Sequence, residues 1–201
     1  MSSHFYAMLF RMRYIERWGL MHNTRPENLS EHTLDVAILT HALCVLGNQR
    51  FHRSYDCGQG VLLALYHDCS EILTGDLPTP IKYHDPAIRT SYKMLERQAN
   101  RQLLELLPGD LKEEYAPCLL PQGQEDLLAL VKGADKLSAL IKCIQEEGLG
   151  NREFTQARQG LEQALREMHL PEVDCFMQEF LPSYGLSLDE LQQGEAPSET
   201  C

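Results

Sequence analysis

The sequence has no Cys-x-x-Cys pair, and its cysteines are odd in number. The seven cysteines are scattered at positions 44, 57, 69, 118, 143, 175 and 201. Disulfide scaffolds and thiolate zinc sites depend on paired or closely spaced cysteines, so both classes are disfavoured. Free thiols fit a reducing compartment, and we expect the protein to be cytoplasmic.

Long hydrophobic runs are also missing, because nowhere do eighteen uncharged apolar residues follow one another. The first twenty residues contain Arg11, Arg13, Glu16 and Arg17, where a signal peptide would need an apolar core. We therefore expect neither a transmembrane helix nor a signal peptide. The chain also lacks strand-like alternation, internal repeats and a glycine-rich phosphate loop.

Positive charge is scarce, with 18 Lys and Arg against 29 Asp and Glu and a formal net charge of −11. Phosphate backbones and acidic lipids would repel such a protein, so we expect no nucleic-acid partner and no membrane partner. A small anionic substrate is compatible with this charge, because it needs only local positive charge.

What the sequence has in quantity is helical periodicity, with apolar residues recurring at spacings of three and four. A chain of 201 residues is long enough to bury one sizeable core. We predict an all-α, single-domain helical bundle over residues 1–191, followed by a disordered polar tail at 192–201. The predicted helices cover residues 3–15, 28–46, 60–73, 87–107, 110–115, 127–148, 152–168 and 171–180.

The predicted helix over residues 87–107 has an apolar stripe on one side and basic residues on the other. We expect the stripe to pack inward and the basic face to be solvated. The stripe consists of Ile88, Leu95, Ala99, Leu103 and Leu106, and the basic face of Arg89, Lys93, Arg97 and Arg101.

Adjacent His67 and Asp68 lie deep in the otherwise apolar helix predicted over residues 60–73. An unpaired carboxylate there would cost on the order of several kcal/mol, and a divalent metal ion is the most economical compensation. Glu71 follows four residues after His67, which would place it above the imidazole on the same helix face. A lone His-Asp pair is more often a hydrogen-bonded surface feature, so other ligands must join it.

Two further residues in helical, apolar context could complete the site. His32 lies in the first turn of a helix that Asn28 and Glu31 begin with a capping-box pattern, although a satisfied core histidine is the alternative interpretation. Asp135 continues the apolar stripe of Leu128 and therefore points at packed side chains, where its carboxylate needs a partner.

The ordered set His32, His67-Asp68 and Asp135 on three separate helices resembles the HD-domain superfamily of metal-dependent phosphohydrolases. The pair Arg17-Trp18 and the run Thr-Gly-Asp-Leu-Pro-Thr-Pro at residues 74–80 are similar to the bacterial 5′-deoxynucleotidase branch of that superfamily. The resemblance covers residues 3–191, and these last two motifs are its most specific part.

The resemblance implies a divalent metal cation, such as Co²⁺ or Mn²⁺, bound by His32, His67, Asp68 and Asp135. The mixed ligand set alone does not choose between these ions and Mg²⁺, Zn²⁺ or Fe²⁺. The resemblance also implies a small deoxynucleotide substrate and a homodimer.

Roles for residues around the metal follow from the same resemblance. Arg17 would orient the substrate phosphate, which suits its planar fork of donors, and Trp18 would discriminate against a ribose 2′-hydroxyl. Glu71 is our candidate for the general base or water-positioning group. Asp76 would bond a sugar hydroxyl, and the sugar and base side of the pocket would be lined by Asp76, Leu77, Pro78 and Thr79.

The expected function is that of a metal-dependent 5′-deoxynucleotidase, which hydrolyses deoxyribonucleoside 5′-monophosphates to a deoxynucleoside and phosphate. One alternative is another HD phosphohydrolase that acts on cyclic, oligo- or polyphosphate nucleotides, against which the Arg17-Trp18 and 74–80 motifs argue. A second is a non-catalytic module in which the metal only pins three helices or senses a nucleotide. Glu71 beside the site disfavours that second alternative.

Overall fold

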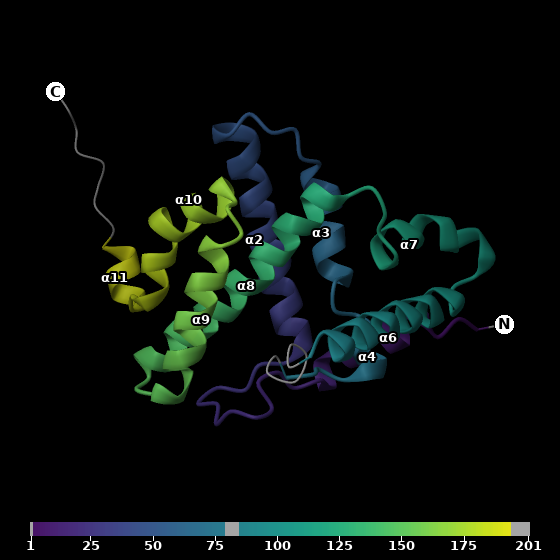
Figure 1. The fold of residues 1–201 in the computed structure, drawn as a ribbon, viewed down its shortest axis with the longest axis horizontal. Helices are drawn as coiled ribbons and strands as arrows, with labels where there is room; N and C mark the ends of the chain where they lie inside the picture. The colour runs from purple at the N-terminus through teal and green to yellow at the C-terminus, as the bar shows by residue number, and fades with distance from the viewer. Residues whose placement is uncertain (1, 79–84, 194–201) are drawn as a thin grey trace.

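The computed structural model describes residues 2–78 and 85–193, and over these residues the fold is entirely helical (Figure 1). The only extended pairing among them is a single bridge between Glu16 and Asn28. The predicted all-α class is therefore confirmed.

The helices and 3-10 turns (η) of the described residues are labelled in chain order, and the main ones are marked in Figure 1. They are α1 Phe5–Leu9, η1 Phe10–Tyr14, α2 Leu29–Arg50, α3 Cys57–Tyr66, α4 Glu71–Thr74, α6 Pro86–Glu105, η2 Gly109–Leu111, α7 Lys112–Leu119, α8 Glu125–Gly148, η3 Arg152–Phe154, α9 Thr155–Arg166, α10 Pro171–Glu179, η4 Leu181–Gly185 and α11 Leu188–Gln192.

The main core lies where α2, α3 and α8 pack together, and α9 and α10 close it on one side (Figure 1). Leu43, Leu137 and Leu140 are fully buried in this cluster. A second apolar cluster joins α1, α6 and α7 through Phe5, Leu103 and other buried side chains. The metal-ligand candidates lie on elements of the main core, which gives them a rigid support.

The start of α2 shows why the chain turns helical at this point. The Asn28 side chain accepts hydrogen bonds from the backbone N–H groups of Ser30 and Glu31 at 3.0 and 3.1 Å. In return, Glu31 Oε2 accepts from the Asn28 N–H at 3.1 Å, which completes the predicted capping box. This reciprocal cap fixes the first turn of α2, the turn that carries His32.

By length and composition alone, α2 is apolar enough to cross a membrane, which we did not anticipate from the sequence. In the fold, 56% of its most apolar window is buried inside the protein, where it packs against α3 and α8. A core helix surrounded by other helices passes the same test.

The prediction of one continuous helix over residues 60–73 is wrong, because α3 ends at Tyr66 and α4 begins only at Glu71. Between them the backbone bonds span three residues, as in Glu71 N to Asp68 O at 2.9 Å. The His67 ring contributes to the break, because its Nδ1 lies 2.7 Å from the Ala64 carbonyl oxygen that a continuous helix would offer to the N–H of Asp68. Glu71 therefore does not stand one α-helical turn above His67.

The structure also corrects the predicted packing of one helix and two predicted helix ends. In α6, Ala99 and Leu103 are buried as predicted, but Ile88 and Leu95 are exposed, because the first half of the helix extends beyond the second core. Pro117, which follows the end of the helix predicted over residues 110–115, lies within α7. The predicted boundary of the tail falls inside α11, and residues 194–201 lie outside the described part of the chain.

Candidate active site

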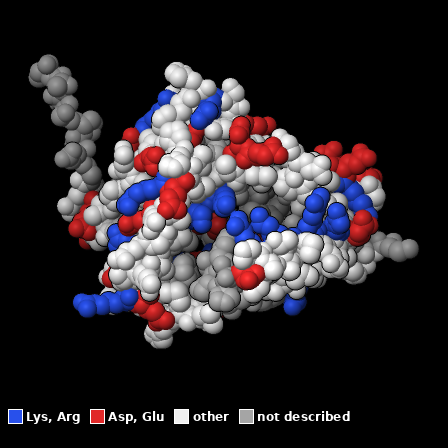
Figure 2. Space-filling view, viewed as in Figure 1, with Lys and Arg blue, Asp and Glu red and all other residues white. Residues whose placement is uncertain are grey.

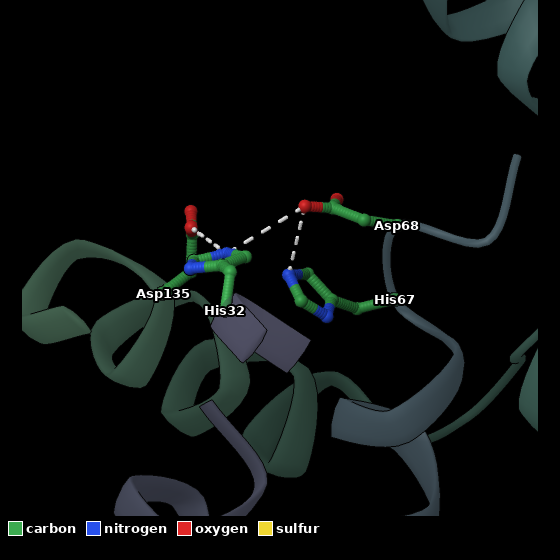
Figure 3. Close-up of side chains that lie close together, drawn as sticks. All are labelled: His32, His67, Asp68 and Asp135. Atoms are coloured by element: carbon green, nitrogen blue, oxygen red, sulfur yellow. Dashed lines mark ion pairs between the residues drawn. The ribbon is translucent and has the colours of Figure 1, made fainter. Parts of the chain in front are cut away.

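Four side chains from three parts of the chain converge on one point (Figure 3). His32 comes from the first turn of α2, His67 and Asp68 from the turn after α3, and Asp135 from the middle of α8. One ligand atom from each lies within 4.8 Å of every other. The structure thus brings together the four residues that the sequence suggested as metal ligands, and we call them the metal centre.

The contacts within the metal centre pair each imidazole with a carboxylate. His32 Nε2 lies 3.2 Å from Asp135 Oδ1, and His67 Nε2 lies 3.0 Å from Asp68 Oδ2. Both Nε2 atoms are buried, yet neither has a hydrogen-bond partner with acceptable geometry within residues 2–78 and 85–193. Two such nitrogen atoms beside two carboxylates form a donor set that fits a divalent cation.

Each imidazole of the metal centre is oriented through its other nitrogen. His67 Nδ1 donates to the Ala64 carbonyl at 2.7 Å, because a carbonyl only accepts, so Nε2 is the nitrogen that can bind a metal after it loses its proton. His32 Nδ1 lies 3.1 Å from Ser138 Oγ, which belongs to α8 and follows Asp135 by one turn. These outer contacts direct both Nε2 atoms at the same point.

The carboxylates of the metal centre are held in their charged form. Burial would raise the pKa of Asp68, but His67, His32 and Arg17 outweigh it and hold that pKa well below its usual range. The pKa of Asp135 is lowered in the same way, chiefly by His32. Burial lowers the pKa of His67, but the charges of Asp68 and Asp135 raise it to about 9 in the metal-free protein. The two ionised carboxylates are suited to a cation, which would take the place of the proton on His67.

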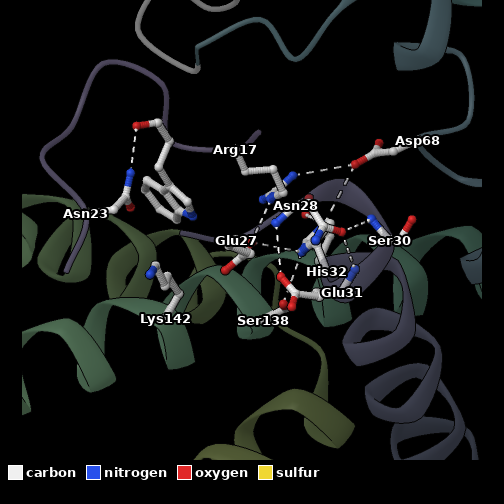
Figure 4. A network of polar contacts seen from close by, with 12 residues as sticks. Arg17, Asn23, Glu27, Asn28, Ser30, Glu31, His32, Asp68, Ser138 and Lys142 are labelled. Carbon is white, nitrogen blue, oxygen red and sulfur yellow. Dashed lines mark hydrogen bonds and ion pairs between the residues drawn. The ribbon is translucent and has the colours of Figure 1, made fainter. Parts of the chain in front are cut away.

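Arg17 is fixed at the edge of the metal centre (Figure 4). Its Nε donates to Glu27 Oε1 at 2.8 Å, and its Nη1 lies 3.8 Å from Asp68 Oδ2. Burial would lower the pKa of Arg17, but the charges of Asp135, Asp68 and Glu27 raise it further. A permanently charged guanidinium is thus anchored by Glu27, with its Nη1 side towards the metal centre.

The neighbouring Trp18 has an unusual backbone, with φ at 59° in the left-handed region. Such a conformation costs roughly 1–3 kcal/mol and persists only where the surroundings enforce it. The indole ring packs against Phe154 with ring centroids 5.3 Å apart. Its Nε1 is buried and has no hydrogen-bond partner among the described residues.

The other predicted residues extend from the Asp68 turn. Glu71 is 3% exposed and begins α4, with its backbone N–H bonded to the Asp68 carbonyl. Asp76 lies close enough to raise the pKa of Arg17. Leu77 and Pro78 are half-buried, whereas Thr79 lies outside the described residues.

Sequence reasoning missed three residues that support this site: Glu27, Ser138 and Phe154. Ser138 could have been found, because it follows Asp135 by three residues on the same helix face. Glu27 lies in a polar connection and Phe154 in a short 3-10 turn, and neither segment has a periodicity that points inward.

Known proteins resemble this chain over nearly its whole length. The family model described as "5'-deoxynucleotidase YfbR-like" matches residues 4–184. A relative from Photorhabdus temperata named 5'-deoxynucleotidase yfbR is 48% identical over 190 residues, which cover 94% of this chain and 96% of the relative. A 5'-deoxynucleotidase of Yersinia pestis (strain Pestoides F) is 49% identical over 191 residues, with the same two coverages.

Solved structures show the same fold at lower identity. An HD-domain phosphohydrolase from Listeria innocua superposes with a TM-score of 0.77 at 20% identity, covering 90% of this chain and 88% of its own. A cyanophage S-2L HD phosphohydrolase, solved with dA and one catalytic Zn²⁺ ion, gives 0.60 at 23% identity and covers 89% and 95%. The family match and the close relatives together show that this chain belongs to the YfbR-like 5′-deoxynucleotidase family.

Proposed function

We propose that the metal centre and Arg17 together form the catalytic site of a metal-dependent 5′-deoxynucleotidase. Membership of its family makes this chain a phosphoric monoester hydrolase that acts on deoxyribonucleoside 5′-monophosphates. The observation that carries the site assignment is the pair of buried, unbonded imidazole nitrogens beside two ionised carboxylates. The fixed guanidinium of Arg17, whose Nη1 lies 3.8 Å from Asp68 Oδ2, supports phosphate binding at the same place.

A divalent ion held by His32, His67, Asp68 and Asp135 would polarise the phosphoryl oxygens and lower the pKa of a water molecule. The ligand set suits Co²⁺, Mn²⁺ or a similar ion. The cyanophage neighbour, whose structure contains one catalytic Zn²⁺ ion and dA, supports both a metal and a deoxynucleoside ligand.

Arg17 supplies the positive charge for the phosphate. Glu27 holds Nε, and Nη1 lies 3.8 Å from Asp68, so the Nη side of the guanidinium has a fixed direction from which it could bond two phosphate oxygens at once. This contact would orient the phosphorus and offset charge that develops on its oxygens during attack.

Glu71 is the proposed general base. Its carboxylate is almost fully buried and belongs to the short helix tied to the Asp68 carbonyl, so it moves with the metal centre. It would accept a proton from the attacking water while the phosphorus–O5′ bond breaks. The O5′ oxygen then takes up a proton, and the products are a deoxynucleoside and phosphate.

Selectivity for the deoxy sugar is assigned to Trp18 and Asp76. Asp76 would bond a sugar hydroxyl, and the rigid indole would occupy the volume that a 2′-hydroxyl needs. Leu77, Pro78 and Thr79 would complete the wall on the sugar and base side.

The local charge fits a small anion better than a polymer. Figure 2 shows Lys and Arg side chains gathered beside a hollow near the middle of one face, although the whole chain is strongly acidic. The net charge of −11 supports a small deoxynucleotide as partner rather than nucleic acid or an anionic membrane. The six described cysteines are all free, which supports a cytoplasmic location.

A homodimer is proposed through the outer face of α2. Leu34, Ile38 and Val45 are 57%, 60% and 39% exposed and recur at spacings of four and seven, so they form one apolar stripe. A helix that is apolar on both its inner and its outer face is typically buried on both faces, here by the core and by a second subunit. Sedimentation of the wild type and of Ile38→Glu would test this interface.

The decisive experiment measures phosphate release by metal-stripped protein before and after single divalent ions are added back. We expect activity to return with metal and to favour deoxyribonucleoside over ribonucleoside 5′-monophosphates. Restored hydrolysis of cyclic or polyphosphate nucleotides alone would instead identify another HD phosphohydrolase. Tight metal binding without turnover of any nucleotide would identify a non-catalytic module.

A further inference from the structure

A buried ion pair lies on α8 away from the metal centre, and the reaction described above does not use it. Lys142 and Glu146 are 6% and 1% exposed and face each other one turn apart. Buried ion pairs are poor stabilisers compared with apolar residues, because both charges lose their water. Lys142 and Glu146 therefore have a structural role that apolar side chains would not fulfil.

That role is visible in the partners of Glu146, which belong to a distant part of the chain. Its Oε2 accepts from the backbone N–H of Thr24 at 2.9 Å, and its Oε1 from the N–H of Arg25 at 3.1 Å. Asn151 Nδ2 also donates to Oε2 at 2.9 Å, and Lys142 donates to both Glu146 and the Arg25 carbonyl. Burial would raise the pKa of Glu146, but these donors hold it well below its usual range.

Glu146 thus bonds to the connection between η1 and α2. We call residues 17–28 of this connection the Trp18 loop. Its two ends are joined by the bond from Arg17 N to Glu27 O at 2.9 Å. Within the described part of the chain, the hydrogen bonds from its tip to other elements go to α8 and the chain that follows. Besides Glu146 and Lys142, Asn151 Nδ2 donates to the His22 carbonyl at 2.8 Å, and Glu153 accepts from the His22 N–H at 3.2 Å. The loop thus has a closed base and a tip fixed by one charged cluster.

The same cluster supports the indole ring through Phe154. Lys142 Nζ lies 5.8 Å from the centroid of the fully buried Phe154 ring, and Trp18 packs against that ring. Inside the loop, Asn23 Nδ2 donates to the Trp18 carbonyl at 3.3 Å (Figure 4). The backbone of Trp18 is thus bonded within the loop, and its ring packs on Phe154 of η3, which Lys142 of α8 contacts in turn.

We propose that Lys142 and Glu146 are positioning residues that fix Trp18 relative to the metal centre and so set the preference for deoxyribonucleotides. The connection between this ion pair and the metal centre is short, because α8 carries Asp135 as well as Lys142 and Glu146. This inference rests on the proposed role of Trp18 in sugar discrimination. Neither residue touches the substrate in this scheme; they act through the Trp18 loop.

Glu146→Gln tests the proposal, because it keeps the size of the side chain but replaces one acceptor oxygen by an amide N–H₂ group, a donor that would face the donors of the cluster. We expect the ratio of kcat/KM for deoxyribo- over ribonucleoside monophosphates to fall on the order of tenfold, as for loss of a charged hydrogen-bond partner. The matched control is Glu147→Gln, one residue further on. Glu147 is also ion-paired, with Arg158 at 2.7 Å, but among residues 2–78 and 85–193 no hydrogen bond or ion pair joins its side chain to the Trp18 loop.

A second readout separates this inference from the proposed function. Trp18 is the only tryptophan in the chain, so intrinsic fluorescence reports its surroundings without any substrate. We expect Glu146→Gln, but not Glu147→Gln, to shift the emission to longer wavelength and to increase quenching by acrylamide. Unchanged emission and an unchanged ratio in Glu146→Gln would overturn the proposal.

The remaining outcomes are also decisive. Altered emission with an unchanged substrate ratio would overturn the proposal if Trp18→Ala lowers that ratio. If Trp18→Ala leaves the ratio unchanged as well, the proposed role of Trp18 fails, and with it the claim on selectivity. If Glu146→Gln does not fold, Asn151→Ala replaces it, because it removes only one donor at the edge of the cluster. We expect it to change the emission and the substrate ratio in the same direction but by less.

Discussion

Arg17 and Glu27 form a side-chain hydrogen bond of 2.8 Å, and the same two residues are joined by a backbone bond of 2.9 Å. Both side chains are nearly buried. This double connection holds the guanidinium in one orientation beside Asp68, before any phosphate is bound. Arg17 is thus pre-organised, so little rotamer entropy is lost when a substrate binds.

Glu27→Gln should therefore impair an enzyme whose Arg17 is intact. Removing a negative charge would by itself favour phosphate, but the loss of a charged hydrogen bond, about 1.5–3 kcal/mol, should dominate. We expect kcat/KM to fall on the order of tenfold or more, measured by steady-state phosphate release. Glu16→Gln, an exposed neighbour, is the control, and wild-type kinetics for Glu27→Gln would contradict this role.

Asp68→Asn and Glu71→Ala should separate metal binding from turnover. Asp68→Asn removes a charge that the metal centre needs, so we expect neither bound metal nor activity. Glu71→Ala should retain metal, because Glu71 is not among the four converging ligands, yet lose turnover. Metal content by mass spectrometry and kcat are the measurements. A Glu71→Ala enzyme with wild-type kcat would exclude Glu71 as the base.

Trp18→Ala should lower discrimination between sugars. Because the indole ring is fixed on Phe154, its removal opens a volume that a ribonucleotide can use. We expect the deoxy-to-ribo ratio of kcat/KM to fall roughly tenfold, mainly through faster ribonucleotide hydrolysis. Trp18→Phe keeps an aromatic ring and serves as the control. An unchanged ratio in Trp18→Ala would remove this residue from the selectivity argument.

The sequence predicted those parts of the site that local patterns encode. The capping box at Asn28 and Glu31 fixed the start of α2, and helical periodicity placed His32 on a buried face. These features depend on residues three or four positions apart, so a window of sequence contains the whole cause. Asp135 faces the other ligands as expected, but its side chain is 38% exposed and not surrounded by packed side chains.

Features that depend on distant contacts could not be predicted in this way. The break after Tyr66 arises where the His67 ring takes up a backbone carbonyl, and the apolar periodicity runs through it unchanged. The contacts of Glu146 with Thr24 and Arg25 join residues more than 120 positions apart. The exposure of Leu95 depends on how far α6 extends past its neighbours.

Ser138→Ala should weaken metal binding without removing a ligand. Ser138 Oγ is the partner of His32 Nδ1, so its loss frees the imidazole to rotate and to change tautomer. Changes of this kind typically cost about 10–100-fold in metal affinity. Titration against a competing chelator would measure the effect. Ser30→Ala on the exposed side of α2 is the control, and equal affinities for the two variants would contradict the role of Ser138.

Glu146 should make the stability of the protein depend on pH. Its pKa is lowered in the folded state from an ordinary value of about 4.3, so its contribution is complete above that value and is lost as pH falls through the folded pKa. Glu146→Gln should therefore reduce the free energy of unfolding at pH 7, and the difference from wild type should shrink in acid. Urea titrations at pH 7 and in increasingly acidic buffers, as far down as the fold survives, would measure this. A difference that stays constant over that range would mean that the carboxylate charge is not what holds the Trp18 loop.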